Sequence, residues 1–196
     1  SMGALKNVLD SPHLDIWSKY LLFRAIPMNL LLWGCETWSM RKALSIKLEV
    51  FLHRNIRRIL RISMFRVKNE HLHNEHVRRM FYDIPRVENM IAARQLDFLG
   101  KTIRGPHDRP AQQMMTACCD NVRRIGRPFL HNKDFIVKNL CLLFANVPEV
   151  TIDDYGSLKD WIREAQDEKY WNDLIECLLD RQATIPTRPA EFPRPR

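Results

Sequence analysis

The sequence predicts an all-α fold: a multi-helix bundle with a long basic amphipathic helix and a C-terminal helical hairpin. The chain of 196 residues has only six glycines, and Leu, Ile, Met, Arg and Glu, which favour helices, are abundant. Its apolar residues recur mainly at intervals of three and four, which is the period of a helix packed on one side. A hydrophobic share of 45% is enough to bury a core.

The first predicted helix starts near Ser11, which would act as the N-cap, with Pro12 at the first helical position. Pro27 is expected to bend or break this helix, because proline lacks the backbone N–H that continues the ladder. An apolar stretch follows at 28–33. We expect Thr37 or Ser39 to cap the next helix.

The long basic helix follows. Residues 41–68 contain nine Arg and Lys residues but a single acid, Glu49. Apolar residues step along one stripe of a 3.6-residue period; they are Leu44, Leu48, Phe51, Leu52, Ile56, Ile59 and Leu60. The basic residues that fall largely off this stripe, and so face solvent, are Lys47, Arg54, Arg57, Arg58 and Arg61. A face meant only for solubility normally mixes charges, so this asymmetry favours contact with a polyanion.

Three further helices are predicted in the middle of the chain. Residues 69–80 should form a short helix with Leu72, His76 and Met80 on one face. A stop at residues 83–85 precedes a helix whose face is formed by Val87, Ile91, Arg94, Gln95, Phe98 and Leu99 and which ends at residues 105–106. A helix is expected at 111–119, a basic loop at 121–129 and a helical pattern at 133–144.

The C-terminal hairpin is predicted from two apolar faces. The first face begins after Ser157, which with Asp160 resembles a capping box, and consists of Leu158, Trp161, Ile162 and Ala165. The second face consists of Trp171, Leu174, Ile175 and Leu178, with Asp167 as a candidate cap. The tail from Thr184 holds four prolines and alternating arginines, and is expected to be disordered or a docking strip.

Charge divides the chain unevenly. Residues 1–148 hold 24 basic and 12 acidic residues, whereas residues 149–180 hold three basic and ten acidic ones. The front of the chain is therefore the candidate polyanion surface. We predict four segments: residues 1–40, a basic helical region at 41–148, an acidic helical hairpin at 149–183 and a Pro/Arg-rich tail at 184–196.

The sequence offers little support for a metal, cofactor or catalytic site. His71, His73 and His76 cluster, but their spacing matches no zinc motif. No phosphate loop, nucleophile elbow or Cys/His signature is present, and the adjacent pair Asp153 and Asp154 fits an acidic helix start better than a magnesium site. We therefore predict no enzyme activity, no cofactor and no small-molecule substrate.

Two further groups of residues are candidate nucleic-acid contacts. The basic loop carries Arg123, Arg124 and Arg127 around a Gly-Arg-Pro core, and is either a phosphate-contacting loop or a simple exposed turn. The five tryptophans lie on apolar stripes, so core packing is the expected role for most of them.

Five cysteines without regular spacing do not form the framework of a secreted disulfide-bonded protein and favour a reducing compartment, nuclear or cytoplasmic. No apolar stretch approaches the roughly 18 residues of a membrane span. We expect no membrane partner.

Two stretches of the chain, LLWGCETW at residues 31–38 and the basic helix at 48–62, are followed in order by further motif blocks. Together these blocks resemble the region after the polymerase core of non-LTR retrotransposon (LINE-type) reverse transcriptases, in which the first two read LLYGSETW and LE.F..R.LRRILGI. Residues 94–109 resemble RRLRWLGHVLRMPDDR, with Lys101 in place of the usual histidine. Gly126-Arg127-Pro128 stands where GRPRKRW is expected, and 161–171 are similar to a closing W…A.DR..W pattern.

The resemblance implies a thumb-like segment at residues 1–40 and a helical extension that holds template or primer, beside the polymerase core of a parent RNA-directed DNA polymerase. The paired catalytic aspartates of that core do not occur in this sequence. We therefore expect a non-catalytic region that holds RNA or an RNA/DNA duplex through its phosphates, as a segment or a stand-alone remnant. The alternative is a helical protein-protein interaction module whose basic helix docks on an acidic partner or on the acidic residues 149–180 of the same chain.

Overall fold

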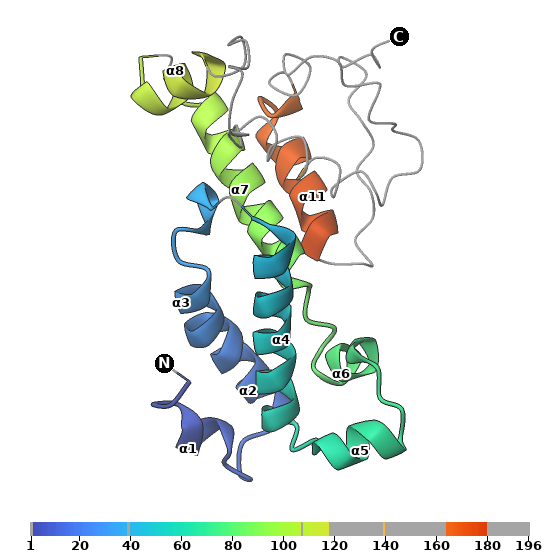
Figure 1. Ribbon diagram of the computed structural model, residues 1–196. Coiled ribbons are helices and arrows are strands. Elements are labelled where there is room, and N and C mark those ends of the chain that lie inside the picture. The colour runs from blue at the N-terminus through green and yellow to red at the C-terminus, as the bar shows by residue number, and fades with distance from the viewer. Residues whose placement is uncertain (1, 39, 107, 118–138, 140–163, 180–196) are drawn as a thin grey trace. The chain divides into compact units, whose positions relative to one another are not determined.

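The computed structural model describes residues 2–38, 40–106, 108–117, 139 and 164–179 (Figure 1). The fold of these residues is all-α, as predicted, and they include no β-strand. Ser39, the basic loop, nearly all of the helix predicted at 133–144, the first half of the predicted hairpin and the tail lie outside the described residues. The four segments predicted from charge stay predictions.

The chain forms two compact units. The first contains residues 1–35 and 40–88, and the second contains residues 36–39 and 89–196. The division falls inside helix α7 (Val87–Ile103), after its first two residues. Each unit is described by itself below.

The first unit is a set of helices joined by short connections. Its helices are α1 (Lys6–Leu9), α2 (Ile16–Phe23), α3 (Asn29–Leu31), α4 (Lys42–Ile59), α5 (Met64–Asn69) and α6 (Asn74–Met80). The chain reverses after α3, so that α4 runs in the opposite direction to α2 and α3 (Figure 1).

The predicted start of the first long helix is wrong. Helix α2 begins at Ile16, and Asp15 is its cap, with the Ser18 N–H donating to Asp15 Oδ2 at 3.2 Å. The Ser11 hydroxyl instead accepts from the His13 N–H at 3.3 Å, within a turn. Aspartate and serine are equally good caps, so only the tertiary structure decides between them.

Pro27 does not end the helix, but it changes the hydrogen-bonding pattern of the backbone around it. Residues Arg24–Met28 form a π-helical turn that joins α2 directly to α3. A wider turn tolerates proline because the missing N–H and the ring meet a different carbonyl than in an α-helix.

The predicted cap of the basic helix is also wrong for Thr37, which lies in a 3-10 turn at Cys35–Thr37. Helix α4 begins at Lys42 with Arg41 as its N-cap, and the Arg41 side chain makes no capping hydrogen bond. The helix predicted at 69–80 is shorter than expected, because α6 covers only residues 74–80 and follows a turn in which His71 has a φ of +48°. The preceding helix α5, which ends at Asn69, was not predicted. Ser63 caps α5, with the Arg66 N–H donating to its hydroxyl at 3.2 Å.

The turn changes which side of α6 is buried. Val77 and Arg78 face inward, whereas His76 and Met80, predicted on the packed face, are exposed. Helix α6 packs against α4. The core of the first unit is completed by Phe23 and Phe81, which have ring centroids 5.8 Å apart and are fully buried.

The expectation that most tryptophans are core residues is only partly met. Trp171 is completely buried and Trp38 is half-buried, but Trp17 is 47% exposed and Trp33 is 80% exposed. Trp161 lies outside the described residues. Apolar spacing shows that a helix has a stripe, but it does not show whether another element covers that stripe.

The second unit is built on α7 and α11 (Glu168–Leu179), with α8 (Pro110–Ala117) following α7. The helix stop at 83–85, the end of α7 before residues 105–106, and the helix near 111–119 are confirmed. So is the cap of α11, where the Tyr170 N–H donates to Asp167 Oδ1 at 3.1 Å. Phe98, predicted on the packed face of α7, is 44% exposed, and Leu96 is buried instead.

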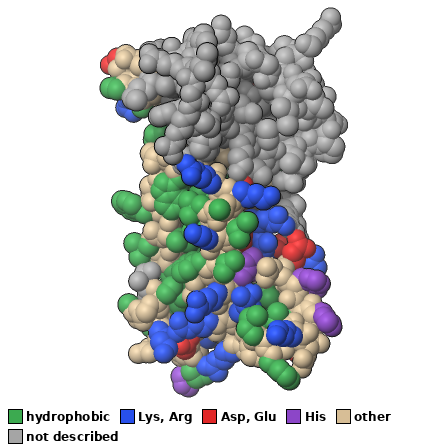
Figure 2. Space-filling model, viewed as in Figure 1, with side chains coloured by type: hydrophobic (Ala, Val, Ile, Leu, Met, Phe, Trp, Pro, Cys, Tyr) green, Lys and Arg blue, Asp and Glu red, His purple; other side chains and the backbone are tan. Residues whose placement is uncertain are grey.

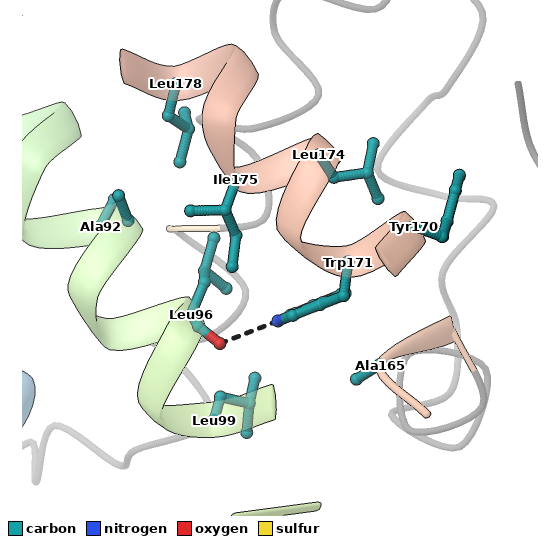
Figure 3. Close-up of a cluster of buried hydrophobic side chains, with 10 residues drawn as sticks. Ala92, Leu96, Leu99, Ala165, Tyr170, Trp171, Leu174, Ile175 and Leu178 are labelled. Atoms are coloured by element: carbon teal, nitrogen blue, oxygen red, sulfur yellow. Dashed lines mark hydrogen bonds between the residues drawn. The ribbon is translucent and has the colours of Figure 1, made fainter. Parts of the chain in front are cut away.

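Trp171 joins the two long helices of this unit. Its indole Nε1–H donates to the Leu96 carbonyl at 2.9 Å (Figure 3). Further bonds link Asn89 with the Leu178 carbonyl at one end, at 3.1 Å, and Arg104 with the Ala165 carbonyl at the other, at 2.8 Å. Helices α7 and α11 are therefore antiparallel. Their buried cluster consists of Ala92, Ala93, Leu96, Leu99, Ala165, Tyr170, Trp171, Leu174, Ile175 and Leu178.

Gly100 permits this close approach, because a Cβ there would lie 2.6 Å from Trp171 Cδ1 and Nε1. We predict that Gly100→Ala destabilises the protein by about 1–2 kcal/mol, since overpacking costs more than the roughly 1 kcal/mol that alanine gains in a helix. Urea unfolding followed by tryptophan fluorescence would measure this. Gly3→Ala, which adds a Cβ in open space, is the control and should change nothing. A Gly100→Ala protein as stable as the wild type would contradict the packing.

Candidate nucleic-acid interface

Helix α4 presents one exposed face, which we call the α4 face and define by Leu44, Ile46, Lys47, Val50, Arg54, Arg58 and Arg61. Spacings of three and four place these residues along one side of the helix and its end. The opposite side is buried and contains Leu52, Ile56 and Ile59. Figure 2 shows basic side chains gathered on this side of the molecule, next to hydrophobic ones.

Lys47 and Arg54 are the free cations of the α4 face. Both are exposed, and among the described residues no acidic side chain pairs with either. They are two helical turns apart, about 10 Å along the axis. These two residues are therefore available to an external anion.

Arg58 and Arg61 are less available, because both bind Asp10. Arg58 Nη2 lies 3.0 Å from Asp10 Oδ2, and Arg61 Nη2 donates to the Asp10 backbone carbonyl at 2.7 Å. The Arg58–Asp10 pair is exposed, so it contributes little and can exchange for a phosphate. Sequence spacing alone gave no signal of this contact, which joins residues 48 positions apart.

Arg57 lies at the edge of the α4 face and is half-buried. Its Nη1 donates to Asn74 Oδ1 at 3.4 Å, which links α4 to the first residue of α6. The five basic residues predicted on this helix therefore lie in one region but differ in their contacts. Lys47 and Arg54 are exposed without an acidic partner among the described residues, whereas the three other arginines each bond to a neighbouring residue. Arg123, Arg124 and Arg127 lie outside the described residues.

Arg61 follows the last turn of α4 and has a left-handed backbone conformation. The N–H of Ile62 donates to the Arg57 carbonyl at 2.8 Å, and that of Arg61 donates to the Arg58 carbonyl at 3.1 Å. This pattern is a Schellman cap, which normally places glycine where Arg61 has a φ of +56°. Arginine adopts this left-handed conformation less favourably than glycine does, but it adds a positive charge at the end of α4.

The α4 face also carries apolar side chains that the sequence analysis missed. Leu44, predicted on the buried stripe, is 41% exposed, and Ile46 and Val50 are 55% and 59% exposed. The buried stripe instead includes the polar residues Ser45, His53 and Asn55. Asn55 is satisfied by its own helix, because its Nδ2 donates to the Phe51 carbonyl at 2.8 Å.

Glu49, the single acid of residues 41–68, is turned away from the α4 face. Its Oε1 accepts from the Val87 N–H at 2.8 Å, and its Oε2 lies 3.5 Å from His53 Nδ1. The carboxylate is therefore engaged at the start of α7 and does not neutralise Lys47 or Arg54.

The side chain of His53 lies on the buried side of α4, where the imidazole is neutral. Its Nδ1 lies 2.8 Å from the Glu49 carbonyl, which can only accept, so Nδ1 carries the proton. Its Nε2 is buried without a hydrogen-bond partner. Burial lowers the pKa of His53 below its usual value, with Arg78 and Arg57 acting in the same direction and Glu49 opposing them.

The described residues contain no group of His, Cys, Asp and Glu side chains that could hold a metal ion. His71, His73 and His76 are exposed. No helix among the described residues is long and apolar enough to cross a membrane.

Comparison with known protein families, with curated proteins and with solved structures finds no match to this chain. The function is therefore inferred from the residues and their geometry.

His53 gives the first unit a predicted pH dependence. Because its pKa is lowered in the folded state, the unfolded chain takes up the proton first as the pH falls through the ordinary value of 6.5. The contribution of His53 is complete above that pH and is lost progressively below it. We expect the free energy of unfolding to fall between pH 7.5 and 5 more steeply in the wild type than in His53→Asn, which retains a donor in place of Nδ1. Equal slopes in urea titrations would contradict this.

Proposed function

We propose that this chain is a non-catalytic nucleic-acid-binding region that holds a phosphate backbone on the α4 face. The observation that carries the proposal is the pair of free cations, Lys47 and Arg54, on a face from which Glu49, the single acid of residues 41–68, is turned away. Exposed cations on one face of a helix can contact phosphate groups without reading the base sequence. Lys47 and Arg54 form such a pair.

The sequence resemblance supports a narrower form of this proposal. In that form the chain belongs to a LINE-type reverse transcriptase, and the α4 face holds RNA or an RNA/DNA duplex beside the polymerase core. Catalysis would reside in that core. Arg57, Arg58 and Arg61 would add contacts as the duplex displaces Asp10 from Arg58.

One observation favours a second candidate function. The exposed Ile46 and Val50 lie beside Lys47, and a phosphate backbone makes no use of apolar side chains. An acidic amphipathic helix from a protein partner would cover both kinds of side chain. The α4 face of a protein-interaction module would then depend on Ile46 and Val50 as much as on the cations.

The deciding experiment is fluorescence anisotropy with RNA, DNA and hybrid duplexes over a salt series. We expect Lys47→Glu with Arg54→Glu to weaken binding at least tenfold in low salt. The salt slope should fall by roughly 1.4 to 1.8 log units per log unit of salt, because each lost phosphate contact removes about 0.7 to 0.9.

The matched control is Lys101→Glu with Lys169→Glu, which changes the net charge equally on exposed positions of α7 and α11. It should bind almost as the wild type does. An equal loss in both double variants would show attraction by net charge alone, and no binding by the folded wild type in low salt would refute the proposal. Unchanged binding in Ile46→Ser with Val50→Ser would argue against a role for the apolar residues.

A second prediction concerns Asp10. Asp10→Asn removes the carboxylate that pairs with Arg58, so Arg58 becomes available and we expect binding to tighten about threefold, with a steeper salt slope. Asp15→Asn is the control, because it changes the charge equally while asparagine still caps α2. Equal tightening in both variants would show a nonspecific charge effect.

A further inference from the structure

Two half-exposed aromatic rings, Trp17 and Tyr82, form a platform on the first unit. Their ring centroids are 4.8 Å apart at an interplanar angle of 70°, and the residues are 47% and 48% exposed. The buried Tyr20 lies 5.4 Å from Trp17 and 5.3 Å from Tyr82, and its own ring rests on Phe81 at 5.5 Å. The exposed rings are therefore fixed by a buried aromatic base.

The backbone at this platform is strained. Tyr82 and Asp83 have φ values of +53° and +46°, a left-handed conformation that is unfavourable for a large side chain such as that of tyrosine. Folding of the first unit offsets this cost. The Tyr82 ring is held at the surface by Trp17 and Tyr20, and the exposed Asp83 is its neighbour in the chain.

Carboxylates flank the two rings in sequence. Asp83 directly follows Tyr82, and the exposed Asp15 precedes Trp17 by two residues and accepts from the Ser18 N–H at the start of α2. One cation is also present, since Arg24 donates to the Tyr20 hydroxyl at 3.0 Å. Two carboxylates against one engaged guanidinium disfavour a phosphate ligand and favour a cationic one.

Rigid aromatic rings with nearby carboxylates suit one class of ligand in particular. A polyproline II peptide packs proline rings on aromatic side chains at a low entropic cost, and its three-residue period puts prolines three apart on one side. Arginines beside the prolines would pair with carboxylates in bidentate geometry.

We propose that the Trp17–Tyr82 platform binds an extended peptide rich in proline and arginine. The sequence of this chain contains such a peptide at residues 184–196, in which Pro186 and Pro189 are three apart and arginines adjoin three of the four prolines. The complementary charges of the platform and of this sequence support the assignment. The proposal concerns a surface other than the α4 face and does not depend on nucleic-acid binding.

The test is fluorescence anisotropy of a labelled synthetic peptide with the sequence of residues 184–196, titrated with the full chain. A second full-length protein, with Pro186, Pro189, Pro193 and Pro195 changed to alanine, removes competition from the chain's own copy of the sequence. We expect saturable binding below about 1 mM by at least this second protein. A peptide with alanine at all four prolines should not bind.

Tyr82→Asn and Asp83→Asn, made in the tighter-binding of these two proteins, locate the site. Asparagine adopts the left-handed conformation readily, which offsets part of the ring packing that Tyr82→Asn removes, so both variants should fold. We expect Tyr82→Asn to weaken peptide binding at least tenfold and Asp83→Asn to weaken it about threefold in low salt. Phe65→Asn, which removes a 75% exposed aromatic from α5, should have no effect.

Three results would overturn the proposal: no saturable binding by either full-length protein, binding that Tyr82→Asn leaves unchanged, or equal binding of the alanine peptide. A single-stranded oligonucleotide that binds through Tyr82, while the peptide does not, would reassign the platform to base stacking. Tighter binding by the tail variant than by the wild type would support the proposal and show that the chain's own sequence competes for the platform.

Discussion

The carboxylate of Glu49 determines how the first unit is arranged around α4. One oxygen accepts from the Val87 N–H, which is among the first N–H groups of α7 and has no partner within that helix. The other oxygen faces His53. A negative charge at a helix start is stabilising, and the same contact removes the only acid of residues 41–68 from the α4 face. One interaction therefore both joins α4 to the start of α7 and leaves Lys47 and Arg54 without an acidic neighbour on their own helix.

The burial of His53 accompanies this arrangement. The Nδ1–H of the neutral imidazole donates to the Glu49 carbonyl of its own helix, close to the Glu49 carboxylate. Burial lowers the pKa of His53, and Arg78 of α6 acts in the same direction. Polar side chains therefore occupy part of the stripe on which α4 packs, next to the fully buried Leu52 and Ile56. Such a stripe fixes the rotation of α4 more narrowly than apolar side chains alone, because a rotated helix would separate the Glu49 carboxylate from the Val87 N–H.

The first unit carries two surfaces with different chemistry. The α4 face combines free cations with exposed aliphatic side chains, whereas the Trp17–Tyr82 platform combines aromatic rings with carboxylates. Ligands that suit one surface are disfavoured by the other, since their charges are opposite. The second unit differs again. Its described helices are joined by the buried Trp171, whose indole reaches the Leu96 carbonyl only because Gly100 has no side chain.

The sequence by itself determined the all-α class, the basic helix, the stop before α7, the apolar face of α11 and its Asp167 cap. These features depend on local periodicity, on proline geometry and on a capping residue three positions from its partner, all of which are encoded within one helix. The tertiary structure alone decided that Asp15 rather than Ser11 caps α2, that Leu44, Trp17 and Trp33 are exposed, and that Glu49 and Arg58 bind Val87 and Asp10. Those outcomes depend on which element covers which face, and the contacts of Glu49 and Arg58 join residues 38 and 48 positions apart. A helical period gives each helix a stripe, but it does not specify the partner that buries the stripe or the charge that pairs across the fold.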